Sequence, residues 1–429
     1  MQPLRILRIP RVAIALRGAA VFLPAVWLLS ACNNGSGGLG MGGIGTQSNA
    51  YVVTNLVSNS SAIAAARTDP MLVNAWGLAF NPQAYAWVAD AGSSVSTLYD
   101  GNGVANPPYL GGPGSITIPA GASGVAGPTG IVYNATSQFV ISSGGVSAPA
   151  FFIYATLGGA IEGWAQTVDA NSAVIAYDSG KNGAVYTGLT MGTDGNGNYY
   201  LYAADFKNDK IDVFNSSFAP IQVGGGFFDS KIPAGYAPYG IRNIPAPDGS
   251  AQIYVTYAEP SNSPQKVAFG AGLGYVAVFD WTGTLVTHLI SQGALNAPWG
   301  LALAPSNFGP MSGALLVGNL GDGTIHGYNA TTGASMGALK LANGQQIAIP
   351  GLWGIAFGNG LNSQPTNTLF FTSGPDQQTA GLYGRIDIAG TYTSSSAGAS
   401  GGTYTQLSGG SSSSTGMGMG MGMGMGGGY

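Results

Sequence analysis

Charged side chains are scarce in this 429-residue sequence. Lys and Arg together number 13 and Asp and Glu 17, which is 7% of the chain, against roughly a quarter in ordinary soluble domains. Nucleic-acid binding requires clustered Lys and Arg, and a coiled coil requires charged flanking positions, so the composition excludes both classes. Hydrophobic residues make up 45% of the sequence, which is enough for a sizeable core. We therefore expect a folded protein with no nucleic-acid partner.

Cysteine is nearly absent too, because Cys32 is the only one in the chain, so an intramolecular disulfide cannot form. Four arginines and an apolar run over residues 18–29 precede Cys32, in the order typical of a secretory signal peptide. Residues 29–32 read Leu-Ser-Ala-Cys, which resembles a bacterial lipobox, in which the cysteine becomes the lipidated N-terminus. This pattern predicts a signal peptide over residues 1–31 and a lipoprotein with lipidation at Cys32.

The residue after the lipobox, Asn33, resembles the sorting signal of Gram-negative lipoproteins that are carried to the outer membrane. The expected location is therefore the bacterial cell envelope, at the outer membrane, with the lipid as the membrane contact. An ordinary export signal followed by a chance cysteine is the alternative interpretation. No later segment has 18 consecutive apolar residues, so the sequence predicts no transmembrane helix.

Two segments of low complexity flank the expected domain. Residues 32–50 are rich in Gly and Ser, and we expect them to form a flexible tether. Residues 391–429 are mainly Ser and Gly and end in alternating Gly and Met, so they cannot bury enough area to offset chain entropy, and we expect disorder. The methionine thioethers could bind Cu(I), but slippage of a simple repeat explains this tail as well.

Glycine is abundant, with 72 residues, and it marks an internal repeat within residues 51–390. Six times an aromatic or polar residue is followed by Gly and an aliphatic residue, at Gly77, Gly130, Gly188, Gly240, Gly300 and Gly354. Short β-branched and aromatic runs separated by turn residues follow each glycine, about four per repeat. This pattern predicts an all-β fold, a six-bladed β-propeller with four-stranded blades. We attribute the glycine content to tight turns that require positive φ.

The ends of the repeat region predict how the ring closes. The sixth unit has only three apparent strands, the last at residues 382–386, before the Ser/Gly tail begins. Residues 51–57 precede Gly77, the glycine of the first repeat. They stand there in the same way that residues 284–290, an expected fourth strand, precede Trp299 of the fifth repeat. We expect residues 51–57 to supply the missing strand, because pairing the two ends removes an exposed sheet edge.

The repeats also resemble known propeller sequences. Residues 88–99 and 203–212 resemble NHL-type propeller repeats. Over residues 51–388 the chain resembles a family of uncharacterised bacterial exported proteins with NHL-like six-bladed propellers; the matching stretches are residues 74–80, 128–132, 233–239, 296–305, 315–323 and 351–354. The resemblance implies fold and export and brings no assigned activity.

One group of candidate site residues lies in loops that share one face of a propeller, before the first strand and after the second strand of each blade. It comprises Trp76, Tyr239, Trp299, Trp353, Asp90, Asp205 and Asn319. An aromatic, acidic mouth of this kind would suit a sugar or peptide ligand. Because these residues recur with the repeat, the other interpretation is that they cap turns and pack between blades, and we favour it.

Residues that break the repeat are stronger candidates for ligand binding. Arg242 stands where the other first strands carry small or uncharged residues, and near a channel it needs a salt bridge or an anionic ligand. Glu259 is one of only two glutamates, the other being Glu162, and it lies in a long loop where a solvated position is the alternative. Tyr257 replaces the Asp, Ser or Asn found in other blades.

Signals for an enzyme are weak. Asp90, Asp205 and Asn319 could supply oxygen ligands for Ca²⁺ at the channel mouth, but no calcium loop or zinc spacing is present, so no cofactor is evident. The Gly-x-Ser-x-Gly motif is absent, and His288 and His326 have no obvious partners. We therefore expect a lipid-anchored propeller that binds a protein or small molecule. The alternative is a metal-assisted hydrolase or lactonase with Asp and Asn ligands at the channel mouth.

Overall fold

The computed structural model describes residues 50–105, 114–261 and 266–390. Cys32, the predicted signal peptide, nearly all of the predicted tether and the Gly-Met tail lie outside these ranges.

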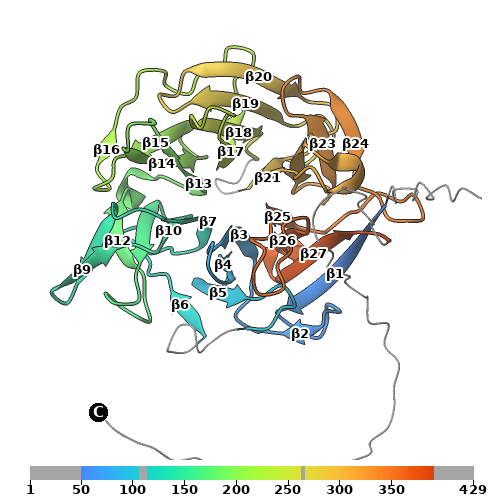
Figure 1. Ribbon diagram of the computed structural model, residues 1–429. Coiled ribbons are helices and arrows are strands. Elements are labelled where there is room, and N and C mark those ends of the chain that lie inside the picture. Colours follow the sequence, from blue (N-terminus) through green and yellow to red (C-terminus); the bar gives the residue numbers. More distant parts are fainter. Residues whose placement is uncertain (1–49, 106–113, 262–265, 391–429) are drawn as a thin grey trace, which may run out of the picture. The chain divides into compact units, whose positions relative to one another are not determined.

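Apart from one two-stranded hairpin, the described strands form six sheets arranged around a central axis (Figure 1). Five sheets are four-stranded, and their strands pair in chain order from the axis outward. Blade 1 is β3–β6 (Ala75–Phe80, Ala86–Asp90, Val95–Tyr99, Ser115–Thr117) and blade 2 is β7 and β10–β12 (Pro128–Tyr133, Phe152–Thr156, Ala160–Trp164, Val174–Asp178). Blade 3 is β13–β16 (Tyr186–Thr193, Tyr199–Asp205, Lys210–Phe214, Pro220–Ile221). Blade 4 is β17–β20 (Ala237–Asn243, Gln252–Ala258, Tyr275–Asp280, Leu285–Ser291) and blade 5 is β21–β24 (Pro298–Leu303, Ala314–Asn319, Ile325–Asn329, Ser335–Ala338).

The sixth blade closes the ring with strands from both ends of the described chain. It contains β25 (Leu352–Phe357), β26 (Leu369–Ser373) and β27 (Leu382–Ile388), with β1 (Tyr51–Ser58) on the outside. β1 pairs antiparallel with β27, from Tyr51 opposite Ile388 to Ser58 opposite Leu382. The short β2 (Arg67–Thr68) adds a parallel fifth strand. The predicted six-bladed propeller, closed by an N-terminal strand, is therefore confirmed.

Apolar side chains fill each interface between neighbouring blades. Between blades 1 and 2, for example, Trp87 stacks on Phe152 with ring centroids 4.3 Å apart. Between blades 5 and 6, Phe308, Leu316 and Phe371 belong to one cluster, and each is fully buried. Similar clusters occupy the other four interfaces, so the core is distributed around the ring. Each blade consequently depends on both neighbours for its burial.

The six glycines that mark the repeat lie where the innermost strands of neighbouring blades meet. None of these six glycines, which we call the anchor glycines, has a positive φ. A Cβ at Gly300 would lie 2.6 Å from the carbonyl oxygen of Trp353, and one at Gly354 would lie 2.8 Å from that of Trp76. These glycines let the innermost strands of neighbouring blades approach each other closely. The attribution of the glycine content to turns is confirmed at other positions, such as Gly103, Gly283 and Gly323, where φ is positive.

Few features depart from the repeat. A hairpin of β8 (Val140–Ser143) and β9 (Val146–Pro149) is inserted between the first two strands of blade 2. Short helical turns occur at η1 (Gly180–Asn182), η2 (Gly309–Met311) and α2 (Pro375–Gln378). Within the described ranges, no helix has the length and apolar character needed to cross a membrane.

Candidate functional site

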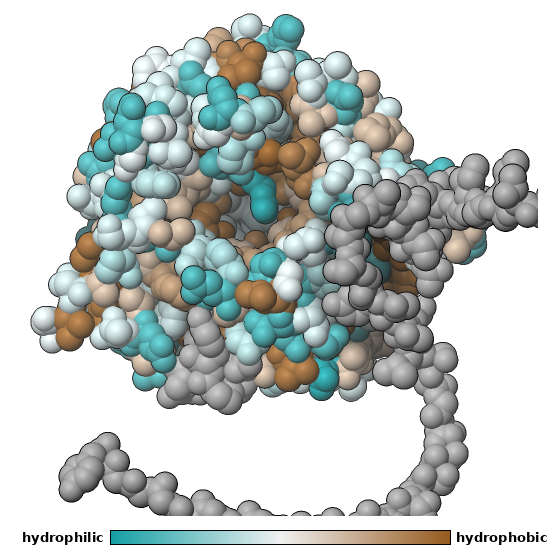
Figure 2. Space-filling model, viewed as in Figure 1, coloured by the Kyte–Doolittle hydropathy of each residue, from teal (hydrophilic) through white to brown (hydrophobic). Residues whose placement is uncertain are grey.

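The innermost strands of the six blades surround a cavity of about 390 Å³ at the centre of the ring. The space-filling view shows the molecule hollowed at this point (Figure 2). Aliphatic side chains from all six blades contribute to its walls: Leu78, Ile131, Leu189, Ile241, Leu301 and Ile355. Of the described residues that line the cavity, Arg242 is the only one with a charged side chain.

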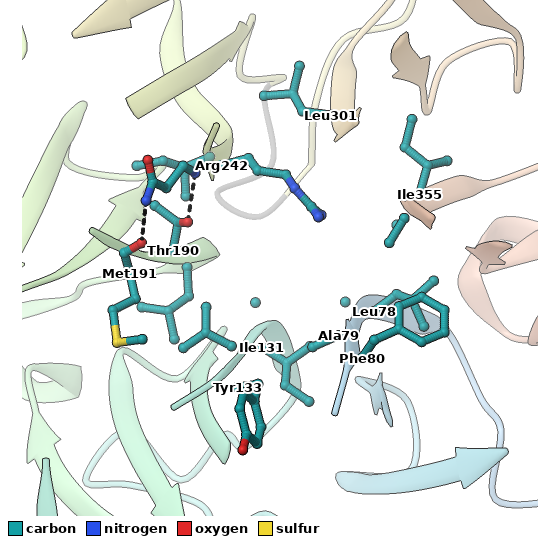
Figure 3. A pocket seen from close by; sticks show the side chains of 18 of the residues that line it. Leu78, Ala79, Phe80, Ile131, Tyr133, Thr190, Met191, Arg242, Leu301 and Ile355 are labelled. Atoms are coloured by element: carbon teal, nitrogen blue, oxygen red, sulfur yellow. Dashed lines mark hydrogen bonds between the residues drawn. The ribbon is translucent and has the colours of Figure 1, made fainter. Parts of the chain in front are cut away.

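Arg242 lies on β17, and the backbone beside it is fixed to the neighbouring blade. The Asn243 N–H donates to Thr190 Oγ1 at 2.8 Å, and Asn243 Nδ2 donates to the carbonyl oxygen of Met191 at 3.0 Å (Figure 3). The Arg242 side chain extends from this anchored position into the open space between the strands (Figure 3). Its placement is therefore set by the contact between blades 3 and 4.

The guanidinium of Arg242 has no protein counter-charge. Across the described ranges, it takes part in neither a salt bridge nor a side-chain hydrogen bond. Burial lowers the pKa of Arg242, and no carboxylate raises it again. Because an arginine remains protonated even when its pKa is lowered, the cavity carries an uncompensated positive charge. The salt bridge considered from the sequence is thus not found in the part of the chain that the structure describes.

The predicted aromatic mouth is a packed cluster. Trp76 and Trp353 stack with ring centroids 3.6 Å apart, and Trp299 lies edge-on to both at 6.3 and 5.9 Å. Tyr239 lies 6.0 Å from Trp353, and none of Trp76, Tyr239 and Trp353 is more than 2% exposed. These rings come from four blades and meet at the N-terminal ends of the innermost strands, so they fill the channel there. Their burial agrees with the packing interpretation.

Trp299 is the member of this cluster that also lines the cavity. Its indole Nε1 donates to the carbonyl oxygen of Thr187 at 2.8 Å, which fixes the ring against blade 3. The cavity therefore has an aromatic side chain, Trp299, at the N-terminal ends of the innermost strands, and Phe80, Tyr133 and Phe357 line it at the C-terminal ends.

The polar residues at the ends of the second strands serve their own blades. Asp90 accepts a hydrogen bond from Thr97 Oγ1 at 2.8 Å, and Asp205 accepts one from Asn208 Nδ2 at 2.7 Å. Asn319 Nδ2 donates to the carbonyl oxygen of Ala294 at 2.8 Å. Burial raises the pKa of both aspartates.

None of Asp90, Asp205 and Asn319 lines the cavity. Within the described ranges, no three His, Cys, Asp or Glu side chains gather so that they could hold a metal ion. Calcium binding at the channel mouth therefore stays a prediction, without a ligand cluster to support it.

Tyr257 and Glu259 lie away from the cavity. Tyr257 is buried on β18 in the cluster between blades 3 and 4, and burial, together with Asp229 and Asp209, raises its pKa. Glu259 is half-buried in the loop that follows β18. Of the residues that break the repeat, only Arg242 is brought to the channel.

The histidines have partners that the sequence did not reveal. His326 Nε2 lies 3.0 Å from Thr324 Oγ1, and burial lowers the pKa of this imidazole. His288 Nδ1 lies 2.5 Å from Asp229 Oδ2, and His288 Nε2 lies 2.6 Å from Ser291 Oγ. Asp229 precedes His288 by 59 residues, so no local spacing indicates the contact.

Similar proteins come from a virus. No protein-family model matches the chain. The uncharacterised protein R648 of Acanthamoeba polyphaga mimivirus is 33% identical over 346 residues, which cover 78% of this chain and 80% of that protein. A second mimivirus protein, L690, is 31% identical over 346 residues, covering 78% and 85%. These relatives do not support the bacterial lipoprotein family that the sequence resembles, although they leave the propeller prediction intact.

Solved propeller structures resemble this chain only distantly. Virginiamycin B lyase from Staphylococcus aureus is 12% identical with a TM-score of 0.43, covering 79% of this chain and 99% of that one. The aldose sugar dehydrogenase of Escherichia coli is 15% identical with a TM-score of 0.41 and the same coverage. At these identities the likeness concerns the fold alone, so neither activity is assigned to this chain.

Proposed function

The chain belongs to the family of the mimivirus proteins R648 and L690, and we propose that it is a binding protein whose central channel holds a small organic anion on Arg242. The observation that carries this proposal is the guanidinium that reaches into the cavity without a counter-charge among the described residues. Arg242 is only partly exposed, so its charge is incompletely hydrated, and an anionic ligand would offset that cost.

The walls of the cavity favour an anion with an apolar body. Aliphatic side chains from the innermost strands of all six blades line the cavity together with Arg242, and Trp299 adds an aromatic side chain. The volume of about 390 Å³ falls in the usual range of small-molecule sites, roughly 300–1,000 Å³. A carboxylate or phosphate group can accept two hydrogen bonds from one guanidinium, while the rest of the ligand contacts the apolar walls.

A second polar group could orient such a ligand. Asn243 lines the cavity beside Arg242, and its buried Oδ1 has no hydrogen-bond partner among the described residues. This oxygen is an unused acceptor, and a ligand hydroxyl would reach it after a turn of the Asn243 side chain opens it to the cavity. We expect a hydroxylated anion to bind more tightly than its unsubstituted counterpart.

Calorimetric titration tests the proposal, with benzoate and 4-hydroxybenzoate as organic anions, inorganic phosphate as a bare anion and benzylamine as a cation of similar size. Both benzoates should bind the wild type, and Arg242→Gln should weaken them by about 10- to 100-fold, since hydrogen bonds to a charged group contribute roughly 1.5–3 kcal/mol. Arg67→Gln, which removes an exposed arginine on β2, is the matched control and should bind like the wild type. Equal binding by wild type and Arg242→Gln, or no binding of any anion, contradicts the proposal.

For location, the lipobox pattern at Cys32 supports the proposal that this propeller is lipid-anchored at a cell-envelope membrane. Growth with labelled palmitate should label the wild type, and Cys32→Ser should remove the label. A label that persists in Cys32→Ser, or a wild type that takes none, would favour an ordinary export signal.

A further inference from the structure

A second polar site lies on the outside of blade 4, away from the channel. It consists of Asp229 in the loop between β16 and β17, His288 on β20 and Ser291 at the end of β20. We propose that these three residues form a nucleophilic serine site that hydrolyses carboxylic esters. The proposal is independent of anion binding at Arg242, because the two sites share no residue.

The three side chains connect in the order that nucleophilic catalysis by serine requires. Asp229 Oδ2 lies 2.5 Å from His288 Nδ1, and His288 Nε2 lies 2.6 Å from Ser291 Oγ. When Nδ1–H donates to the carboxylate, Nε2 is left as the acceptor for the serine hydroxyl. An imidazole held in this way can take the serine proton as a general base, and such sites are recognised by geometry, whatever the order in the chain.

Solvent exposure of the side chains increases from Asp229 to His288 to Ser291, as expected where the serine must meet a substrate. The side chain of Asp229 is fully buried and that of His288 is 10% exposed, whereas Ser291 is exposed. Asp229 is also fixed by its own loop, because its Oδ1 accepts the Lys231 N–H at 2.9 Å. The carboxylate is therefore held in place, and the hydroxyl is open to a substrate.

A β-bulge brings His288 and Ser291 together. Along a regular strand, residues three apart point to opposite faces. In β20 the pairing register shifts at this point: Ile290 lies opposite Val276, but His288 lies opposite Ala277, which leaves Leu289 as the extra residue. Bulges that re-aim a side chain are common beside active sites.

The turn after Ser291 supplies donors for an oxyanion. Gln292 adopts a positive φ of 51°, which is unusual for a residue with a side chain. Its N–H donates a hydrogen bond to the carbonyl oxygen of Gly274. The following N–H groups, of Gly293 and Ala294, donate no hydrogen bond within the described ranges. The proposal assigns these two N–H groups to the negative oxygen that develops when an ester is attacked.

Exposed phenyl rings nearby indicate the class of substrate. Phe228 directly precedes Asp229 and is 73% exposed. Phe269 is 58% exposed in a loop that runs beside residues 291–296, where the Gly272 N–H donates to the carbonyl oxygen of Leu295 at 2.8 Å. Both rings offer apolar surface on loops beside the triad, and we therefore assign the site to esters with an apolar acyl or aryl group.

The reaction needs only water as a co-reactant. Ser291 Oγ attacks the ester carbonyl carbon, and its proton passes to His288 Nε2. The bond from the carbonyl carbon to the alcohol oxygen then breaks, and the departing alcohol takes that proton. Water attacks the resulting acyl-serine, gives one proton to His288, and releases the carboxylic acid as Ser291 recovers its hydroxyl hydrogen.

Labelling by a fluorophosphonate, followed by peptide mapping, tests the site in the full chain, together with hydrolysis of p-nitrophenyl butyrate. We expect the label on Ser291, and Ser291→Ala should abolish it and lower the hydrolysis rate at least 100-fold. Ser335→Ala is the matched control, because Ser335 is also exposed on an outer strand and has no histidine partner. A folded wild type that takes no label at Ser291 and hydrolyses the ester no faster than Ser291→Ala would make the triad a structural clamp and overturn the proposal.

Asp229 is a positioning residue in this scheme, and its variant separates orientation from folding. Asp229→Asn should lower kcat by 100-fold or more and leave KM within about twofold, because the substrate does not touch the carboxylate. An unchanged kcat in Asp229→Asn, at an unchanged melting temperature, would also contradict the proposal.

Discussion

At the scale of the residue, Glu162 is a carboxyl group whose pKa is strongly changed by its surroundings. It lies fully buried on β11, and neither carboxylate oxygen has a hydrogen-bond partner among the described residues. Burial, with a smaller contribution from Asp178, raises the pKa of Glu162 to about 8. The folded protein therefore favours the protonated acid at neutral pH, whereas the unfolded chain favours the carboxylate.

Glu162→Gln should change how stability depends on pH. Because the pKa of Glu162 rises from 4.5 to about 8 on folding, the unfolding free energy of the wild type falls as pH rises through that interval, by up to roughly 1.4 kcal/mol per pH unit from this group. Glutamine does not ionise, so the variant should gain stability relative to the wild type as pH rises from 4.5 to 8. Urea unfolding at several pH values measures the difference, and parallel curves for the two proteins would refute this explanation.

Single residues also show what the sequence could reveal. Arg242 could be predicted because a charged residue replaces a small or uncharged one at a fixed position of a repeat. The pairing of His288 with Asp229 could not, since it depends on a long loop and on a bulge, and neither has a signature in the spacing. The burial of Trp76 and Trp353 depends on rings from four blades that meet at the axis, which a single repeat does not indicate.

At the scale of the element, the innermost strands are held by close backbone contacts between blades. The Thr187 hydroxyl of blade 3 donates to the carbonyl oxygen of Tyr239 in blade 4 at 2.8 Å. The anchor glycines allow such contacts because any side chain would meet the neighbouring backbone. The glycine repeat can be recognised in the sequence because each blade needs this glycine. The reason for it, a close backbone contact with the next blade, can be recognised only in the structure.

Gly300→Ala should destabilise the propeller by about 1–3 kcal/mol, the usual cost of overpacking. The added methyl group would lie 2.6 Å from the carbonyl oxygen of Trp353, and backbone cannot move aside as a side chain can. Gly224→Ala is the matched control, because nothing lies within 4 Å of its Cβ position. Chemical denaturation compares the two, and equal stabilities would show that blade spacing does not require glycine.

At the scale of the whole molecule, the ring is closed by pairing strands from opposite ends of the described chain. Tyr51, Leu56 and Val57 of β1 are at most 4% exposed, so closure buries apolar area as well as the edge of β27. The sequence predicted this arrangement because the sixth unit lacked a strand and an unassigned strand preceded the first. The inserted β8–β9 hairpin had no counterpart in the repeat and was not predicted.

Removal of β1 should open the ring. A chain that begins at Asn59 loses the strand, whereas one that begins at Ala50 keeps it and serves as the control. We expect a loss of about 5 kcal/mol or more in unfolding free energy, since each buried side chain contributes roughly 1.5–3 kcal/mol. Calorimetry should show a much lower melting temperature for the shorter chain, and equal melting temperatures would exclude closure by β1.

The closed ring makes the channel a chamber that is packed with aromatic rings at one end and, among the described residues, carries one charge on its wall. Anion binding in this chamber is the central claim, and a crystal structure with 4-bromobenzoate tests it most directly, because the anomalous signal of bromine locates the ligand. We predict bromine inside the cavity and the carboxylate within hydrogen-bond distance of the Arg242 guanidinium. An empty cavity in crystals that hold the ligand elsewhere, or a protein carboxylate paired with Arg242, would contradict the account.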